Sequence, residues 1–308
     1  MTRKIVTAGA QLGPIARDEP RESVVARLLA MLQRSARYGA GLVVFPELAL
    51  TTFFPRWLLE DGELDRYFES EMPSAEVGPL FDEARRLSIG FYLGYAERVH
   101  EDGEWRRYNA SILVDGDGRI AGKYRKVHLP GFAEPQGDRA MQHLEKRYFR
   151  PGNLGFPVFD AFGGKVGMCI CNDRRWPETY RSLALAGAEL IALGYNTPVG
   201  YSPDPKQAML SDFHNHLVMQ SGAYQNAAWV VGVAKAGREE GSDLIGGSAI
   251  IAPSGEIVAQ ARTVGDEVIV AECDLDAAAA YRRDMFDFAR HRRPDQYGII
   301  TRMPDAKG

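Results

Sequence analysis

Three short stretches of this chain recur in the same order about 140 residues further on, and this repeat limits the folds that the chain can adopt. The pairs are 39–45 with 187–193, 93–96 with 231–234, and 111–114 with 248–251. Each pair alone is a weak match, but three matches in one order are not expected by chance. The sequence therefore predicts two similar halves that pack as one domain.

Helix and strand patterns alternate along both halves. Apolar residues recur at helical spacing over 21–37, and Leu42–Phe45 is apolar on both faces, as in a central strand. Two sheets face to face with helices outside would bury the strands of both halves, so we expect an α/β fold, a four-layer αββα sandwich. It should span residues 1–280, for which a hydrophobic content of 45% is ample. Residues 281–308 form a C-terminal extension that we expect to pack on a neighbouring subunit.

The charge pattern argues against several partners. The net charge of −4 arises from 41 acidic and 37 basic residues scattered along the chain, so nucleic acid is not an expected partner. No stretch approaches the roughly 18 uninterrupted apolar residues of a membrane span. The odd count of 3 cysteines and an N-terminus without a signal-peptide pattern favour a reduced, cytoplasmic protein.

Cys171 stands where an apolar strand pattern stops. The run from Val166 to Ile170 is followed by Cys171 and then by four polar or charged residues, and Pro177 is a typical first residue of a helix. Backbone N–H groups at such a strand-to-helix turn favour a thiolate and can hold an oxyanion. Cys171 is therefore a candidate nucleophile.

Two other interpretations are open for this stretch. A free cysteine is more often core packing than a nucleophile, and Cys169, deeper in the apolar run, fits that interpretation. A Cys-x-Cys metal site would need further soft ligands. The only other cysteine is Cys273, and no histidine lies close in sequence, so we expect no metal.

Glu47 and Lys126 are charged candidates for the surroundings of such a thiol. Glu47 closely follows the apolar run 42–45, a costly place for a carboxylate that has neither a partner nor a task. Lys126 follows a hairpin predicted around Asp115–Gly118. Taken alone, Lys126 is better explained as part of a solvated charged stretch.

Three motifs together resemble the signatures of the nitrilase superfamily of carbon–nitrogen hydrolases. They are FPE at 45–47, GKYRKVHL at 122–129 and CNDRRWPE at 171–178, in the order of the family. The resemblance covers nearly the whole chain and implies the αββα sandwich, no cofactor, and a homodimer or homotetramer. It also implies a catalytic triad of Glu47, Lys126 and Cys171.

The resemblance adds Glu145 as a further catalytic carboxylate, which would orient Lys126 or the attacking water. The alternative for Glu145 is an ordinary helix-face residue paired with Lys146 or Arg147. In the expected chemistry, Glu47 takes the thiol proton as Cys171 attacks a carbonyl carbon, and later returns a proton to the departing ammonia. Lys126 and the N–H after Cys171 would stabilise the oxyanion.

Further stretches look like the N-carbamoyl-D-amino acid amidohydrolase branch of that superfamily. They are ELALTTFFPRW at 47–57, QHLEKRYF at 142–149 and GYNTP at 194–198. The branch implies hydrolysis of N-carbamoyl-D-amino acids to the D-amino acid, carbon dioxide and ammonia. Segments 131–140 and 199–208 depart from that branch and are expected to border the pocket.

Arg175 is the residue that we expect to clamp the substrate carboxylate, with Arg174 assisting or structural. A guanidinium binds a carboxylate through two parallel hydrogen bonds, and both arginines closely follow the nucleophile. The other substrate-binding candidates are Asn172, His128, His143, Asn196 and Thr197. The alternatives are a β-ureidopropionase, an N-carbamoylputrescine amidohydrolase, an aliphatic amidase, or a non-catalytic binding protein on the same fold.

Overall fold

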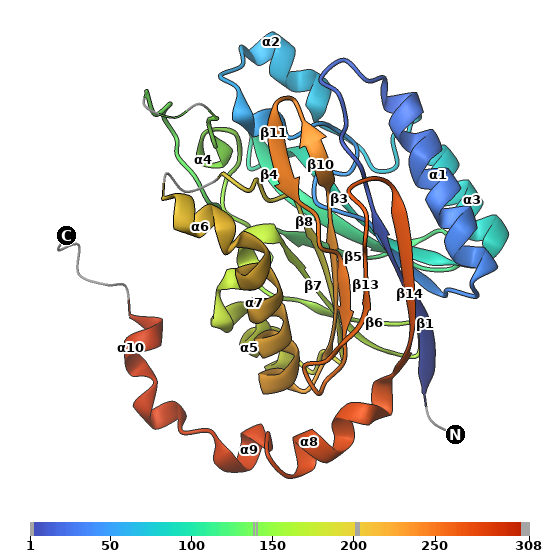
Figure 1. The fold of residues 1–308 in the computed structure, drawn as a ribbon, viewed down its shortest axis with the longest axis vertical. Coiled ribbons are helices and arrows are strands. Elements are labelled where there is room, and N and C mark those ends of the chain that lie inside the picture. The colour runs from blue at the N-terminus through green and yellow to red at the C-terminus, as the bar shows by residue number, and fades with distance from the viewer. Residues whose placement is uncertain (1–2, 138, 140, 201–203, 303–308) are drawn as a thin grey trace.

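A computed structural model describes residues 3–137, 139, 141–200 and 204–302 of the chain. Two six-stranded sheets lie between two outer layers of helices (Figure 1). The first sheet has the order β14 (Glu267–Asp274), β1 (Lys4–Gln11), β2 (Leu42–Val44), β3 (Gly90–Glu101), β4 (Glu104–Val114) and β5 (Ile120–Arg125). The second has the order β13 (Ile257–Gln260), β12 (Ala249–Ile251), β9 (Trp229–Ala234), β8 (Leu190–Tyr195), β7 (Gly164–Ile170) and β6 (Val158–Ala161).

Two helices pack on the outer face of each sheet. They are α1 (Arg21–Arg37) and α3 (Gly78–Leu87) on the first sheet, and α5 (Pro177–Leu185) and α7 (Ser211–Asn226) on the second. α1 has the bounds predicted from its apolar spacing, and α5 begins at the predicted Pro177. The predicted four-layer αββα sandwich is confirmed.

Short helices fill the connections between these elements. They are η1 (Phe54–Arg56), α2 (Asp61–Leu64), η2 (Asp65–Tyr67), α4 (Glu145–Tyr148), η3 (Cys171–Arg175), α6 (Pro205–Met209), η4 (Leu275–Ala278), α8 (Ala279–Arg283), α9 (Phe288–His291), η5 (Pro294–Gln296) and α10 (Gly298–Thr301). In the described part of the chain, no helix is long and apolar enough to cross a bilayer.

The two halves have the same strand pairing. In the first, β1, β2 and β3 pair in parallel and β4 and β5 follow antiparallel; in the second, β7, β8, β9, β12 and β13 do the same. Each also has an antiparallel edge strand, β14 beside β1 and β6 beside β7. The three repeated stretches correspond to β2 with β8, β3 with β9 and β4 with β12. The repeat read from the sequence is therefore a repeat of topology.

The inner faces of the two sheets share one apolar core. Tyr92 and Leu113 from the first sheet belong to the same buried cluster as Met168, Leu193 and Val231 from the second. Tyr92 also donates a hydrogen bond from its hydroxyl to the backbone carbonyl of Cys169, at 3.0 Å, across the interface between the sheets. This packing fixes the ends of β2 and β7 relative to each other.

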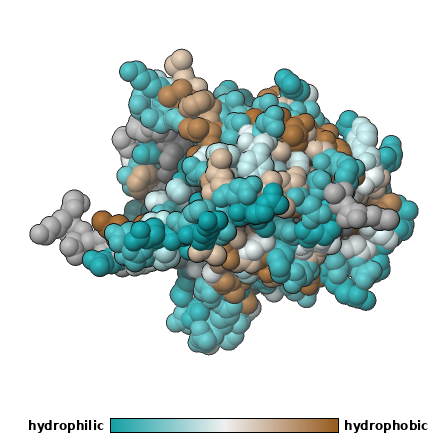
Figure 2. Space-filling model, turned by 90° about the horizontal axis from the view of Figure 1, so that it is seen from below, coloured by the Kyte–Doolittle hydropathy of each residue, from teal (hydrophilic) through white to brown (hydrophobic). Residues whose placement is uncertain are grey.

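The C-terminal extension curves away from the sandwich below α5 and α7 (Figure 1). Near its start, the Phe286 ring lies 5.1 Å from that of Tyr224, and the Arg181 guanidinium lies 4.2 Å from the ring of Phe288. Seen from below, this side of the molecule mixes hydrophilic and hydrophobic surface (Figure 2). Near the end of the described chain, Ile299 is 81% exposed.

Candidate active site

Cys171 lies at a strained turn between β7 and α5. Its φ is 46°, in the left-handed region that a residue with a Cβ rarely adopts and that is common at functional sites. Asp173 fixes this turn, because its carboxylate accepts hydrogen bonds from Ile170 N at 3.0 Å, from the Tyr124 hydroxyl at 2.8 Å and from His128 N at 2.9 Å. The direction of the Cys171 thiol is therefore set by the backbone.

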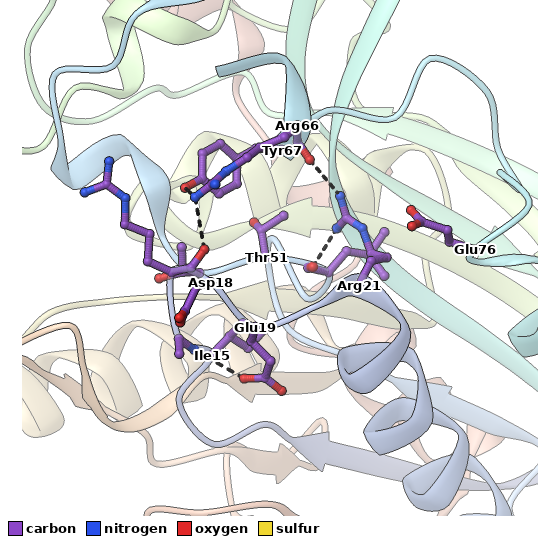
Figure 3. Close-up of a pocket in the computed structure, with 12 residues that line it drawn as sticks. Ile15, Asp18, Glu19, Arg21, Thr51, Arg66, Tyr67 and Glu76 are labelled. Atoms are coloured by element: carbon purple, nitrogen blue, oxygen red, sulfur yellow. Dashed lines mark hydrogen bonds between the residues drawn. The ribbon is translucent and has the colours of Figure 1, made fainter. Parts of the chain in front are cut away.

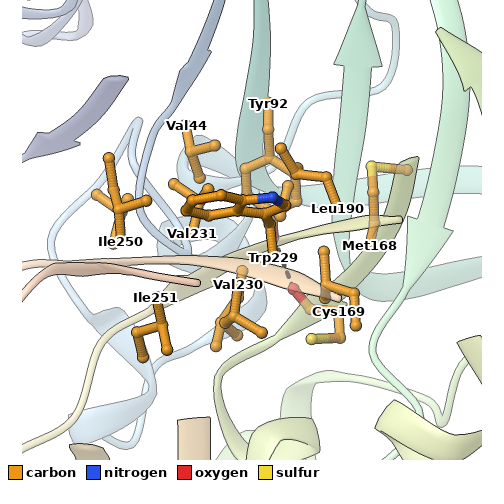
Figure 4. Packing of buried hydrophobic residues seen from close by; sticks show 14 of the residues in the cluster. Val44, Tyr92, Met168, Cys169, Leu190, Trp229, Val230, Val231, Ile250 and Ile251 are labelled. Carbon is orange, nitrogen blue, oxygen red and sulfur yellow. Dashed lines mark hydrogen bonds between the residues drawn. The ribbon is translucent and has the colours of Figure 1, made fainter. Parts of the chain in front are cut away.

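The other two cysteines lie in apolar surroundings. Cys169 is packed among the side chains of the central core (Figure 4), and burial raises the pKa of its thiol well above the ordinary value. Burial likewise raises the pKa of Cys273 to about 12. Within the described residues, no group of three or more histidine, cysteine or acidic side chains is placed to hold a metal ion.

Lys126 lies between two carboxylates at the centre of the site. Its ammonium donates hydrogen bonds to Glu47 Oε1 at 2.7 Å and to Glu145 Oε2 at 2.6 Å, and all three side chains are fully buried. Glu145 thus pairs with Lys126, whereas its chain neighbour Arg147 pairs with Glu134. Glu47 accepts two further hydrogen bonds, from Asn109 Nδ2 at 2.8 Å and from Asn196 N at 2.9 Å. Its carboxylate is held at both oxygens.

Two glycines allow the backbone of Glu47 to pass between the sheets. A Cβ added to Gly94 of β3 would lie 2.7 Å from Glu47 Cα, and one added to Gly194 of β8 would lie 2.6 Å from Glu47 N. Both distances are too short for any side chain. The predicted base therefore stands where the two halves meet.

The charges and the burial of the site keep the Cys171 thiol protonated, so its attack needs a base. Burial and the nearby Glu47 raise the pKa of Cys171, and the cations Lys126 and Arg174 offset this only in part. Burial opposes the charge on Lys126, but Glu145 and Glu47 more than compensate and raise its pKa. Burial likewise opposes the charge on Glu145, whose pKa Lys126 and His143 nevertheless lower to about 2. A protonated thiol thus faces an ammonium flanked by carboxylates.

Arg174 supports the turn of the nucleophile. It is 1% exposed, and it donates to Cys171 O at 2.7 Å, Thr197 Oγ1 at 2.9 Å and Asn215 Oδ1 at 3.0 Å. Its guanidinium also stacks on the ring of Tyr195, 4.4 Å from the centroid. The sequence left Arg174 as either an assistant in carboxylate binding or a structural residue. Because its donors bind protein atoms, its geometry is that of a structural residue.

Arg175 points the other way. Its side chain is exposed and donates to Asn172 Oδ1 at 3.1 Å, while Asn172 Nδ2 donates to His128 O at 3.0 Å. The His128 ring lies 2.8 Å from Asp173 Oδ1 and stacks on Trp176, with centroids 5.0 Å apart. Asn172, His128 and Arg175 are thus gathered along η3.

The remaining candidates lie against the catalytic charges. Thr197 Oγ1 is 3.7 Å and Asn196 O is 3.8 Å from Cys171 Sγ, and His143 Nε2 is 3.0 Å from Glu145 Oε1. The side-chain amide of Asn196 is buried, and in the described structure neither its oxygen nor its nitrogen has a hydrogen-bond partner. Buried polar atoms without a partner are uncommon in folded proteins, so this amide stands out among the residues around the site.

The sequence interpretation missed Asn109, Asp173 and Asn215. Asn109 carried a usable signal, since it is a polar residue that begins an otherwise apolar stretch of β4 and is 1% exposed. Asn215 carried none, because its partners Arg174 and Tyr195 are distant in sequence. Asp173 has one local partner, Ile170 N, but its partners Tyr124 and His128 are also distant in sequence. Of the two segments predicted to border the pocket, Phe132 N donates to His143 O and Val199 N to Asp243 O; residues 138, 140 and 201–203 lie outside the described chain.

A separate small cavity lies beside the segment that follows Glu47. It has a volume of about 220 Å³ and none of the four predicted catalytic side chains lines it (Figure 3). It is bordered by Ile15, Glu19, Arg21, Thr51, Thr52, Tyr67 and their neighbours. The hydroxyl oxygens of Thr51 and Thr52 are buried and have no hydrogen-bond partner among the described residues.

Comparisons with known proteins agree over nearly the whole chain. The family model described as carbon-nitrogen hydrolase matches residues 7–283. A nitrilase from Pyrococcus abyssi is 34% identical over 269 residues, 87% of this chain and 90% of that protein. An N-carbamoylputrescine amidase from Arabidopsis thaliana is 32% identical over 289 residues, 91% and 90% of the two chains.

A third relative and a solved structure complete the comparison. A citrullinase from Francisella tularensis is 31% identical over 287 residues, 90% of this chain and 92% of that protein. The crystal structure of a carbon-nitrogen hydrolase from Helicobacter pylori G27 has a TM-score of 0.83 at 24% identity, covering 97% of this chain and 99% of that one. At that identity, the likeness shows the fold.

Proposed function

The chain belongs to the carbon–nitrogen hydrolase family, the nitrilase superfamily, and from this premise we propose that it hydrolyses the ureido group of N-carbamoyl compounds through a thioester on Cys171. The observation that carries the proposal is the buried ammonium of Lys126, held between Glu47 and Glu145 beside a thiol of raised pKa. The family membership makes the chain a hydrolase of carbon–nitrogen bonds. The ureido class and the residue roles are our proposal.

The first half-reaction forms the thioester. Glu47 takes the proton of Cys171 as the sulfur attacks the ureido carbon, and negative charge develops on the carbonyl oxygen. Lys126, whose pKa is raised, stabilises that charge together with the backbone N–H that follows the nucleophile. Glu47 then returns its proton to the departing nitrogen, and ammonia leaves.

The second half-reaction restores the enzyme. Glu47, again ionised, takes a proton from a water molecule that attacks the thioester carbon. The carbon–sulfur bond breaks, the sulfur regains a proton, and the carbamate that is released decomposes to the amine and carbon dioxide. The unpaired side-chain amide of Asn196 supports a ureido substrate, because that group offers both N–H donors and a carbonyl acceptor.

Within the ureido class, we propose N-carbamoyl-α-amino acids as substrates, with Arg175 binding the carboxylate. Arg174 is unsuited to this task because its donors already bind Cys171 O, Thr197 and Asn215. Arg175 lies on the same turn, four residues after the nucleophile, and its guanidinium is exposed. The preference for the D enantiomer rests on the resemblance of 47–57, 142–149 and 194–198 to that branch.

N-carbamoylputrescine and citrulline are second candidates because two relatives are named for enzymes that act on them. Both molecules carry a terminal ureido group, which agrees with the proposed chemistry. N-carbamoylputrescine ends in an ammonium, and near Arg174 and Arg175 like charges would repel each other. Citrulline carries its carboxylate several bonds further from the ureido carbon than an N-carbamoyl-α-amino acid does.

A substrate panel tests the proposal. Ammonia release is measured for an N-carbamoyl-D-amino acid, its L enantiomer, N-carbamoylputrescine, citrulline, a simple aliphatic amide and a nitrile, with Cys171→Ala and Glu47→Gln as inactive controls. We expect the N-carbamoyl-D-amino acid to have the highest kcat/KM. A higher kcat/KM for N-carbamoylputrescine would overturn the carboxylate clamp but keep the ureido class, and preference for the amide or the nitrile would overturn both.

A further inference from the structure

A short hairpin outside both large sheets stands beside the site. β10 (Ala236–Glu239) and β11 (Ser242–Ile245) form a separate two-stranded sheet, and Figure 1 shows them at the end of the molecule that carries α2 and α4. The turn between them has left-handed φ values of 49° at Glu240 and 82° at Gly241. Lys235 joins the hairpin to the end of β9.

The strand β11 forms backbone hydrogen bonds with the segment 197–199, which contains Thr197. Ile245 N donates to Thr197 O at 3.0 Å, and Val199 N donates to Asp243 O at 2.8 Å. Thr197 is the residue whose hydroxyl lies 3.7 Å from Cys171 Sγ. β11 therefore fixes the backbone next to the nucleophile.

The other strand holds the segment that follows Glu47. Oε1 of Glu239 accepts hydrogen bonds from Phe53 N at 2.8 Å and from Arg56 Nη2 at 2.7 Å, and its other oxygen forms an ion pair with Lys235. Lys235 also donates to Thr51 O at 2.9 Å. Glu239, Lys235 and Arg56 are at most 3% exposed.

This segment in turn contacts His143 and Leu144, the two residues that precede the carboxylate of Glu145. The ring of Phe53 lies edge-on to His143, with centroids 5.0 Å apart, and Leu144 N donates to Pro55 O at 2.8 Å. His143 Nε2 lies 3.0 Å from Glu145 Oε1. A continuous set of contacts thus runs from Glu239 to Glu145.

Stability alone is a weak reason for burying these charges. Apolar side chains of similar volume usually serve as well, because desolvation cancels most of the attraction within a buried ion pair. One carboxylate with four directed donors does, however, allow only one arrangement of the segments that it joins. Such rigidity matters most beside a reaction that needs aligned groups.

We propose that Glu239 is a positioning residue for the hydrolysis: it fixes the segment Phe53–Arg56, and through that segment the His143 and Glu145 pair that holds Lys126. The inference rests on the proposed function, since Lys126 must be the group that stabilises the oxyanion. Glu239 would act through the groups that it holds, Ile15 N, Phe53 N, Arg56 and Lys235.

The test compares two neighbouring glutamates. Glu239→Gln keeps the side-chain shape but loses the negative charge that binds Arg56 and Lys235, and it should lower kcat by about 10- to 100-fold with little change in KM. It should also displace the midpoint of the pH dependence of Cys171 alkylation by iodoacetamide, by about half a pH unit or more. Glu240→Gln, on the exposed turn, should stay within about twofold of the wild type in both measurements.

The alkylation measurement needs no substrate, so it separates this inference from the proposed function. A wild type that hydrolyses none of the ureido compounds would overturn the function, while a displaced alkylation midpoint in Glu239→Gln would still support positioning. If Glu239→Gln lowers only the melting temperature and leaves kcat and the alkylation profile unchanged, the inference is wrong. If Glu239→Gln does not fold, the same two measurements are made on Phe53→Leu, which removes the ring contact with His143 and leaves the buried charges intact. Unchanged kcat and an unchanged alkylation profile in Phe53→Leu would then contradict the inference.

Discussion

At the scale of single residues, two thiols on one strand have opposite surroundings. Cys169 is enclosed by the core, whereas Cys171 adjoins Thr197, Asn196 and the charges of Glu47 and Lys126. Both thiols have raised pKa values, and each has a carboxylate nearby. The one near Cys169 is Asp173, which already accepts hydrogen bonds from Ile170 N, Tyr124 and His128 N, whereas the one near Cys171 is Glu47, the proposed base. The difference lies in the neighbours that the fold provides, because both cysteines are equally buried.

Cys171→Ala should abolish turnover and leave the fold intact. Cys169→Ala should keep most of the activity and lose about 1 to 3 kcal/mol of unfolding free energy, because it leaves a small cavity in the core. Ammonia release and urea unfolding measure the two effects. Mass mapping of the acyl intermediate, or of an iodoacetamide adduct, should find Cys171 modified, and an adduct on Cys169 would contradict the assignment.

Glu145 should make the protein sensitive to acid. Its pKa falls from 4.5 to about 2 on folding, so the unfolded state takes up the proton first as the pH falls. The stability that Glu145 contributes is complete above about pH 4.5 and is lost as the pH falls to about 2; a shift of this size is worth on the order of 3 kcal/mol.

Urea unfolding between pH 6 and pH 3 checks this expectation. Glu145→Gln should have a shallower pH dependence of unfolding free energy than the wild type, and the exposed Glu134→Gln should follow the wild type. Parallel curves for the wild type and Glu145→Gln would show that the carboxylate is not paired in solution.

At the scale of elements, apolar periodicity predicted the helix α1, the start of α5 and the correspondence of the two halves. These features depend on local patterns, and burial follows such patterns closely. The hairpin β10–β11 was not predicted, because its strands are short and contain the charged residues Arg238, Glu239 and Asp243. Which of them is buried depends on Arg56 and Phe53, nearly two hundred residues earlier in the chain.

The two arginines of the turn η3, Arg174 and Arg175, should respond differently to substitution. Arg175→Ala should raise KM and lower kcat/KM by about 100-fold or more for N-carbamoyl amino acids, because a bidentate carboxylate contact is lost, and should barely affect a neutral ureide. Arg174→Ala should impair all substrates alike, since it removes hydrogen bonds to Cys171 O and Thr197. Steady-state kinetics on both substrates distinguish the two, and an equal loss on both in Arg175→Ala would contradict the clamp.

At the scale of the whole molecule, the C-terminal extension leaves a space open. Beyond its contacts with Tyr224 and Arg181, a cavity of about 990 Å³ lies between the extension and helices α5 and α7. Apolar side chains line both sides of it, among them Leu185, Leu217, Met285 and Ile300. Apolar surface that faces this open space costs free energy in water. We propose that a second copy of the chain fills this space, in a homodimer or a larger assembly of dimers.

Deletion of residues 281–308 should therefore change the assembly. We expect the full chain to sediment as a dimer or tetramer at micromolar concentration and the truncated chain to sediment as a smaller species. Sedimentation velocity measures both, and substitution of Ile299 and Ile300 by serine gives a milder test of the same surface. A full-length monomer would contradict the proposal.

The passage of Glu47 between Gly94 and Gly194 has a consequence for how the enzyme would fail. The backbone of Glu47, the proposed base, packs closely against both sheets, so its position depends on how the two sheets are placed relative to each other. A shift of one sheet by about 1 Å, too small to expose much apolar surface, would already misalign the proton transfer. Heating, pressure or distant core substitutions should therefore reduce turnover well before any spectroscopic sign of unfolding, and activity would be the most sensitive measure of how well the two halves fit.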